Sequence, residues 1–124
     1  MDLKDKQKIV QTIGAADESI AKLEEGIHAL QAQGKTPSKS DTQLLQSIYR
    51  AINLLKTNPF TGENVPQNLW PKEFERLPNL FRMELSQFWR LLYYVTGDEV
   101  RVISVIFEIS DHKHYDQLFG YKKK

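Results

Sequence analysis

The run Phe88–Ile109, FWRLLYYVTGDEVRVISVIFEI, determines the fold class of this chain. It consists of two segments rich in β-branched and aromatic residues, separated by Gly97 and Asp98. Such residues favour strands, and a Gly-Asp pair between two strands is typical of a tight hairpin turn. The second segment, Val100–Ile109, is apolar on both faces for much of its length, as expected of a central strand. The sequence therefore predicts a β-hairpin, with strands over residues 89–96 and 100–109.

A third strand is predicted directly before this hairpin. Residues 80–85 alternate between apolar and charged side chains, which is the pattern of a strand with one buried face. The alternation places Arg82 and Glu84 together on the face opposite to the apolar residues. Residues 80–109 are therefore expected to form a three-stranded meander.

The N-terminal part of the chain predicts a strand followed by a helix. The segment KIVQTIGA at residues 8–15 is β-branched and apolar, which favours a strand. Over residues 17–33, apolar side chains recur at steps of three and four, the period of a one-sided helix. Asp17 is the expected N-cap of this helix, and Gly34 is expected to end it.

A second helix is predicted over residues 40–57. Ser40 is followed three positions later by Gln43, which is the spacing of a capping box. With a short link to the first helix, this segment is expected to complete a helical hairpin. Residues 60–79 contain Pro66, Pro71 and Pro78 and predict a long loop, which is unusual in a small domain and often functional.

The whole chain is expected to be one α+β domain, residues 1–124, with the order β-α-α-β-β-β. The helical hairpin would pack on one face of a small, twisted, mainly antiparallel sheet. Residues 110–124 are expected to form a short turn or helix and a basic tail that ends in Lys122–Lys124.

Composition excludes several classes of protein. The chain has 124 residues, is 40% hydrophobic and 27% charged, and contains no cysteine, so disulfide frameworks and thiol chemistry are excluded. No apolar run approaches the roughly 20 residues that span a bilayer, and the N-terminus resembles no signal peptide. A cytoplasmic location without membrane partners is therefore expected. The net charge of +1 neither requires nor excludes nucleic acid.

Three motifs in this order resemble those of the RelE/ParE superfamily, the toxins of type II toxin–antitoxin systems. Leu55–Gly62, LKTNPFTG, resembles the family's LxxNPFxG exit from the second helix. Phe88–Tyr93, FWRLLY, resembles the YRVLY strand, and Ile109–Tyr115, ISDHKHY, resembles the HRxxxY end of the last strand. The resemblance spans the chain from Ile9 to Tyr121.

For function, the resemblance implies a toxin that a cognate antitoxin neutralises. In the RelE branch the toxin is an mRNA interferase, an endoribonuclease that cleaves mRNA, with the ribosome as the expected setting. Attack by a substrate 2′-hydroxyl on the adjacent phosphate needs a base, an acid and cations, but no metal and no small-molecule cofactor. The ParE branch instead inhibits DNA gyrase and cuts no RNA, and kinship of fold does not choose between the branches.

Three charged strand residues are candidates for the site. Arg90 stands in an otherwise apolar strand and matches the arginine of the YRVLY motif, a phosphate binder in the RNase branch. Arg82 could neutralise phosphate, and Glu84 could accept the 2′-hydroxyl proton. A structural alternative is equally simple, because Arg90 could pair with Glu84 or Glu108 on an exposed strand face.

The second group of candidates is the run His112–Tyr115. A histidine can protonate a leaving oxygen, a lysine can hold phosphate, and a tyrosine can stack on a base. These roles would fall to His112, with His114 in reserve, to Lys113 and to Tyr115. The interval from histidine to tyrosine is shorter than in the commoner family pattern, so the sequence leaves open which histidine is functional.

Two other interpretations of the site remain open at this level. His112 and His114 with Asp111 and Asp116 could be taken for a metal site, but ligands packed so closely in sequence seldom converge on one ion. Relatives that cleave RNA are usually strongly basic, whereas this chain is nearly neutral. A binding protein without catalysis, either a gyrase inhibitor or an inactive toxin relative, is therefore the alternative prediction.

Overall fold

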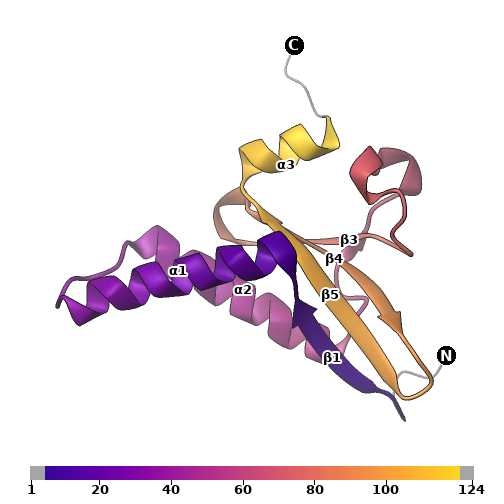
Figure 1. Ribbon diagram of the computed structural model, residues 1–124, viewed down its shortest axis with the longest axis horizontal. Coiled ribbons are helices and arrows are strands. Elements are labelled where there is room, and N and C mark those ends of the chain that lie inside the picture. Colours follow the sequence, from indigo (N-terminus) through magenta and orange to yellow (C-terminus); the bar gives the residue numbers. More distant parts are fainter. Residues whose placement is uncertain (1–4, 121–124) are drawn as a thin grey trace.

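The structure, a computed structural model, describes residues 5–120, which form an α+β domain with a five-stranded mixed sheet and three α-helices (Figure 1). The larger elements follow one another as β1 (Gln7–Thr12), α1 (Gly14–Ala32), α2 (Lys39–Thr57), β2 (Glu63–Asn64), β3 (Phe81–Glu84), β4 (Arg90–Gly97), β5 (Arg101–Ser110) and α3 (His112–Phe119). The predicted α+β class and the order of the main elements are confirmed. The short β2 is an addition to the predicted order, and α3 is one of the two alternatives, turn or helix, expected after β5.

The strands lie in the order β1-β5-β4-β3-β2. β5 pairs in parallel with β1 and antiparallel with β4, so it lies inside the sheet, as the apolar run Val100–Ile109 predicts. β3 pairs antiparallel with β4 and with the two-residue β2. The register of β4 and β5 shifts at Leu92 and Tyr93, where β5 contains a bulge.

The helical hairpin covers one face of this sheet, as expected (Figure 1). Its side of the sheet holds the larger core cluster, which includes Ile20, Ile48, Leu55, Leu91, Tyr93 and Ile106. The two helices are also joined at their surface, where the Tyr49 hydroxyl donates a hydrogen bond to the Glu24 carboxylate. This bond and partial burial raise the pKa of Tyr49 to about 12.

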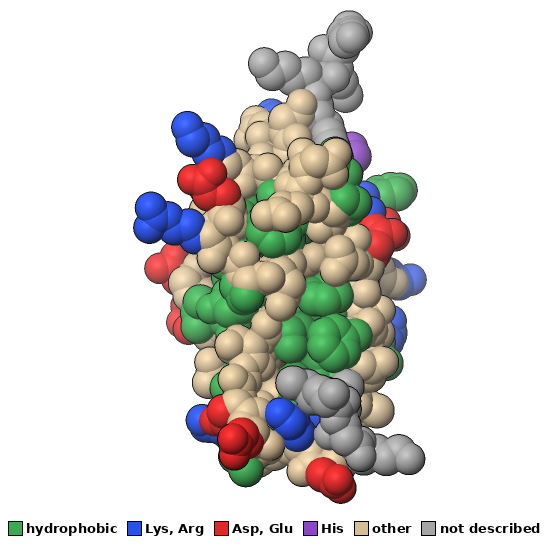
Figure 2. Space-filling model, turned by 90° about the vertical axis from the view of Figure 1, so that its right-hand side faces the viewer, with side chains coloured by type: hydrophobic (Ala, Val, Ile, Leu, Met, Phe, Trp, Pro, Cys, Tyr) green, Lys and Arg blue, Asp and Glu red, His purple; other side chains and the backbone are tan. Residues whose placement is uncertain are grey.

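The opposite face of the sheet is not left open. A second cluster forms there around Leu92 and Tyr115, and the half-buried Trp70, Phe74 and Phe107 pack against it. Figure 2 views the side of the molecule away from α1 and α2, and shows hydrophobic side chains gathered near its middle, with charged groups toward the margins. The long loop and α3 therefore cover part of the sheet face opposite to the helical hairpin.

The start of α1 differs from the prediction. The strand β1 ends at Thr12 and the helix already begins at Gly14, with Ile13 as N-cap and no side-chain cap. Asp17 lies inside the first turn, where its carboxylate accepts a hydrogen bond from the Thr12 hydroxyl at 2.8 Å. An acidic residue in the first turn is favourable without being the cap, because it faces the positive end of the helix dipole.

The N-cap of α2 also differs from the prediction and lies two residues earlier in the chain. Ser38 is the N-cap, and its hydroxyl accepts a hydrogen bond from the Asp41 amide at 3.1 Å. Ser40 lies inside the helix, so the predicted capping box at Ser40 and Gln43 does not form. Two serines stand two residues apart here, and the sequence rule could not distinguish them because either could accept from a first-turn amide.

The loop at residues 60–79 contains more regular structure than predicted, and the C-terminal segment forms a helix. The loop holds β2 and two short 3-10 turns, Gln67–Leu69 and Lys72–Phe74. The segment after β5, expected to be a short turn or helix, is the helix α3, with Asp111 as N-cap and Gly120 in the left-handed conformation at its end. The predicted basic tail at Lys122–Lys124 lies outside the described residues.

The β4–β5 turn forms where the sequence predicts it. Asp98 holds the turn because its carboxylate accepts hydrogen bonds from the Val100 and Arg101 amides, both at 2.9 Å, and from the Arg101 guanidinium. These bonds, led by that from Val100, lower the pKa of Asp98 to about 2. The predicted Gly97-Asp98 turn is therefore confirmed, with the ladder closing between Gly97 and Val102.

The exit from α2 is fixed to the sheet by Tyr93. Its buried hydroxyl donates to the Pro59 carbonyl at 2.8 Å and accepts from the Gly62 amide at 2.9 Å. Burial raises the pKa of Tyr93, against the opposing effect of the Gly62 amide. A side chain at position 62 would meet the Tyr93 hydroxyl at 2.7 Å and the Arg82 carbonyl at 2.9 Å, so only glycine fits there.

The variant Tyr93→Phe should lower the free energy of unfolding by about 1–3 kcal/mol, because it leaves the Pro59 carbonyl and the Gly62 amide without their partner. Urea denaturation measures this change. Tyr94→Phe is the matched control, since the described residues give the Tyr94 hydroxyl no hydrogen-bond partner, and it should change stability by less than about 0.5 kcal/mol. Equal effects of the two variants would contradict the assigned role of Tyr93.

Candidate functional site

The centre of the candidate site is the Tyr115 ring, which lies against the guanidinium groups of two arginines. The Arg90 guanidinium carbon is 5.2 Å from the ring centroid and that of Arg82 is 5.8 Å away. Arg82 also donates a hydrogen bond to the Tyr115 hydroxyl at 2.7 Å. Cations near the face of an aromatic ring are attracted to it, by about 0.5–2 kcal/mol each. The ring therefore fixes both arginines on the sheet face opposite to α1 and α2.

Alternation along two neighbouring strands brings these arginines together. Arg82 lies in β3 and Arg90 begins β4, and the register pairs Glu84 with Arg90. Residues 82, 84 and 90 therefore share the face that the sequence assigned to the first two of them. This part of the predicted site is brought together as expected.

Arg90 is the more deeply placed of the two arginines. Only 14% of its side chain is exposed, and it donates a hydrogen bond to the Phe88 carbonyl at 2.5 Å. Its nearest Glu84 oxygen is 3.8 Å away, which is a weak ion pair. The Arg90 Nε is buried and has no hydrogen-bond partner. One donor of this guanidinium thus lacks an acceptor, which is a costly state for a buried polar group.

Arg82 is held by two partners. In addition to the Tyr115 hydroxyl, it forms an ion pair with the Glu63 carboxylate in β2. Burial alone lowers the pKa of Arg82, but the hydrogen bonds from Arg82 to Tyr115 and Glu63 outweigh that effect and raise it. Arg82, Glu63 and Glu84 also line a hollow of about 250 Å³ beside β3. Of the candidate residues, Arg82 and Glu84 line this hollow, whereas Arg90 and the two histidines do not.

The two histidines lie at the start of α3 and have different partners. His112 Nε2 is 3.3 Å from the Asp116 carboxylate one turn later, and the ring is 6.2 Å from that of Phe88. His114 Nε2 is 3.8 Å from the Glu108 carboxylate of β5. Both side chains are more than half exposed, so the structure brings both histidines to the rim of the site.

The turn before β4 holds a residue that the sequence reasoning missed as a candidate. Phe88 is 72% exposed, although it contacts Arg90 through its carbonyl and His112 through its ring. Gln87 and Phe88 have φ values of 58° and 65°, in the left-handed region that non-glycine residues rarely adopt. Such strain costs about 1–3 kcal/mol per residue and is concentrated at functional sites. In the sequence, the only indication that Phe88 belongs to the site is its position in a turn next to a strand arginine.

The predicted residues thus lie close together, but the exposure of some of their side chains does not suit the roles assigned to them. Tyr115 is only 2% exposed, so its ring is not available to stack on a base in this conformation. Lys113 is exposed on α3, and the described residues give it no ion pair. Glu84 is largely exposed, with 74% of its side chain accessible. The exposed aromatic of the site is Phe88, and the buried one positions the arginines.

Among residues 5–120, no group of three or more His, Asp or Glu side chains has the arrangement of a metal site. His112 and Asp116 form a pair on α3, whereas His114 turns to Glu108 on β5. The alternative of a His-x-His metal centre therefore gains no support from the geometry of these side chains.

Comparisons with protein-family models, curated proteins and solved structures find no match to this chain. No α-helix within the described part of the chain is long and apolar enough to cross a lipid bilayer. Interpretation of the site therefore depends on its own geometry and chemistry.

The variant Tyr115→Ala should lower the free energy of unfolding by about 3–5 kcal/mol, because it removes a buried aromatic ring and the partner of both arginines. Thermal or urea unfolding followed by circular dichroism measures the loss. Phe88→Ala is the control, and should cost less than about 0.5 kcal/mol because the ring is exposed. A small effect at Tyr115 would show that the ring does not hold α3 on the sheet.

Proposed function

We propose that this chain is a toxin of the RelE/ParE type and acts as a metal-independent endoribonuclease on mRNA, with a cognate antitoxin as its inhibitor. The observation that carries the proposal is the convergence of Arg82, Arg90 and the two α3 histidines on one face of the sheet. The motif resemblance supplies the family, and the cytoplasm is the expected location. The site supplies the groups that the reaction needs.

Each step of the cleavage has a group in this site. A substrate phosphate would bind beside the exposed edge of the Arg90 guanidinium, and Arg82 would add a second cation. Glu84 takes the proton of the 2′-hydroxyl, whose oxygen attacks phosphorus, and His112 or His114 gives a proton to the departing 5′-oxygen. The products are a 2′,3′-cyclic phosphate and a 5′-hydroxyl. Lys113 stabilises charge at the rim.

Phe88 is the proposed stacking platform for a base. Its ring is exposed beside His112, whereas the Tyr115 ring is buried. Base stacking on an aromatic side chain is worth about 1–3 kcal/mol per base. Tyr115 then acts as a positioning residue, because it sets the separation and direction of Arg82 and Arg90.

The balance of charge favours a second candidate function. Each basic side chain of the site except Lys113 has a carboxylate beside it: Glu63 for Arg82, Glu84 for Arg90, Asp116 for His112 and Glu108 for His114. Such pairing weakens the attraction for RNA, which depends on unneutralised cations. A non-catalytic protein of the same fold, such as a ParE-like gyrase inhibitor or an inactive toxin relative, is the alternative proposal.

Incubation of the purified protein with mRNA, with and without ribosomes, tests the proposed chemistry. The wild type should generate fragments with 2′,3′-cyclic phosphate ends, and Arg90→Ala should reduce the cleavage rate at least about a hundredfold, as loss of a donor to a developing anion does. Arg101→Ala is the matched control, because Arg101 lies at the opposite end of the β4–β5 hairpin. Growth arrest on expression with intact mRNA, or an Arg90 variant with full activity, would support the non-catalytic alternative.

Loss of the exposed ring gives an independent prediction. Phe88→Ala should weaken binding of a short single-stranded RNA about five- to a hundredfold, the equivalent of one lost base stack. Fluorescence anisotropy with a labelled oligonucleotide measures the affinity. Phe60→Ala is the control, since Phe60 is 45% exposed but packs against Phe81 in β3. Similar losses for the two variants would contradict the stacking role.

A further inference from the structure

The outer edge of β3 is only partly covered. β2 pairs with Phe81 and Arg82 and then ends, so Met83 and Glu84 have no strand beside them on that side in the described chain. On the outer side of β3, away from β4, the Leu80 carbonyl accepts a hydrogen bond from the Val65 amide. On the inner side, the Leu85 amide donates a hydrogen bond to the Trp89 carbonyl. Backbone groups alternate in direction along a strand, so the amide and carbonyl of Glu84 point outward. An outward pair of this kind is a site for strand addition.

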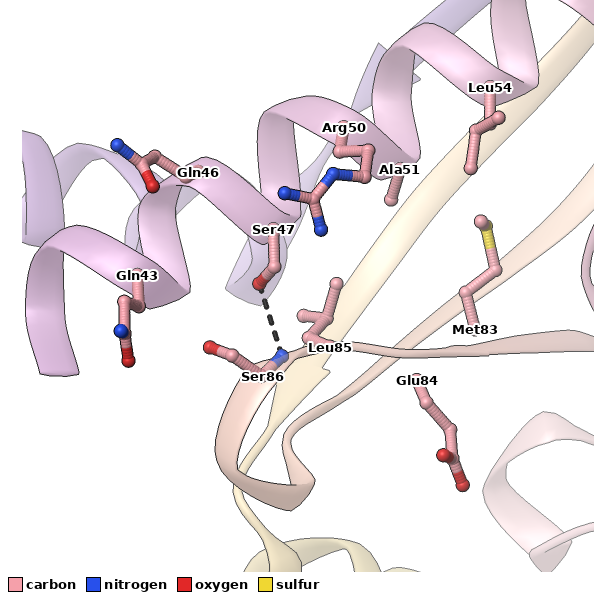
Figure 3. Close-up of a pocket in the computed structure, with 10 residues that line it drawn as sticks. All are labelled: Gln43, Gln46, Ser47, Arg50, Ala51, Leu54, Met83, Glu84, Leu85 and Ser86. Carbon is pink, nitrogen blue, oxygen red and sulfur yellow. Dashed lines mark hydrogen bonds between the residues drawn. The ribbon is translucent and has the colours of Figure 1, made fainter.

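A groove lies directly beside this edge, between α2 and the segment from Met83 to Ser86 (Figure 3). Its volume is about 520 Å³. Its apolar wall consists of Ala51, Leu54, Met83 and Leu85. Figure 3 shows Leu54 pointing toward Met83, while the Glu84 side chain points away from the groove. The groove can therefore accept an apolar side chain from a strand that lies along β3.

The rim of the groove is polar and carries one uncompensated charge. Figure 3 shows Arg50, Gln46 and Ser47 projecting from α2 on the side of the groove opposite to β3. Arg50 is exposed, and no ion pair of residues 5–120 involves it. The Glu84 carboxylate, the acidic group nearest in the lining, turns to Arg90 instead. An occupant with a carboxylate would thus find a free cation beside an apolar slot.

We propose that the β3 edge and this groove together bind an extended segment of a partner protein, which adds a strand beside Met83 and Glu84. One apolar side chain of the segment enters the groove between Leu54 and Met83, and an acidic side chain pairs with Arg50. Main-chain hydrogen bonds supply affinity in such strand addition, and the side-chain pockets supply specificity. The proposal does not depend on RNA cleavage, because it uses neither Arg90 nor the histidines.

The form of the surface favours a strand over a helix as occupant. A docked helix satisfies its own backbone, whereas the outward amide and carbonyl of Glu84 are matched only by an extended chain. The exposed Leu54 (44%) and Tyr49 (42%) continue the apolar surface along α2. A second, shallow depression continues from the groove along α2, and it is lined by residues 46, 49, 50, 53, 54 and 57. The segment therefore has contacts on either side of Arg50.

A displayed library of random peptides roughly nine residues long, a little more than an ordinary strand, is the probe. Selection on the full chain should enrich sequences with alternating apolar residues and an acidic residue at a constant spacing. A synthetic peptide of the enriched sequence should protect the Glu84 amide from hydrogen exchange. N-methylation of its amides should abolish binding only at the alternate positions that face β3.

Two variants locate the peptide on this surface. Arg50→Glu and Leu54→Asp should each weaken its binding at least about tenfold, or 1.4 kcal/mol. Arg76→Glu, a charge reversal in the exposed loop, should leave the affinity unchanged. A peptide whose acidic residue is replaced by lysine should recover binding to Arg50→Glu. Both substituted side chains are exposed, and unchanged melting temperatures will show that the variants fold.

Several results would overturn the proposal. Failure to enrich any consensus, binding of the enriched peptide as a helix, or equal affinity for the Arg50 and Arg76 variants would each exclude strand addition at this edge. A concentration-dependent dimer in sedimentation that Leu54→Asp dissociates would instead assign the surface to a second copy of the chain. Loss of RNA cleavage with retained peptide binding would refute only the proposed nuclease.

Discussion

The contact of the Tyr115 ring with Arg82 and Arg90 is the constraint on which this site depends. It joins α3 to β3 and β4, three elements that no local interaction would bring together. The ring is buried, yet both of its neighbours are cations, so aromatic attraction and a hydrogen bond offset part of their desolvation.

A strained turn connects this site with the groove on the other side of β3. Ser86 donates its amide to the Ser47 hydroxyl of α2 at 3.2 Å, and Gln87 contacts the Ser40 carbonyl at 3.2 Å. At the other end of the turn, the Phe88 carbonyl accepts from Arg90. These contacts fix a turn with two consecutive positive φ values, as strain requires if it is to persist.

The charge pattern explains how a nearly neutral chain can hold a cationic site. Arginine and histidine side chains lie near carboxylates from β2, β3, β5 and α3, so the positive charge of the site is largely balanced within it. Such balance reduces the cost of placing Arg90 at 14% exposure. A polyanion would therefore bind mainly by replacing the carboxylates that now pair with the arginines. Its phosphate groups would take the place of Glu84 or Glu63, and a general basic surface would contribute less.

The sequence was sufficient to predict β1, β3, β4 and β5, the two long helices and the shared strand face of Arg82 and Glu84. These follow from local periods, since alternation fixes the face of a strand and a three-to-four repeat fixes that of a helix. It could not choose between Ser38 and Ser40 as a cap, and it did not show that the second sheet face would be covered. Tertiary structure decided that Tyr115 is buried, that Phe88 is exposed, and that β2 stops short along β3. Those outcomes depend on which segments, distant in the sequence, pack on the same surface. No local sequence pattern predicts that packing.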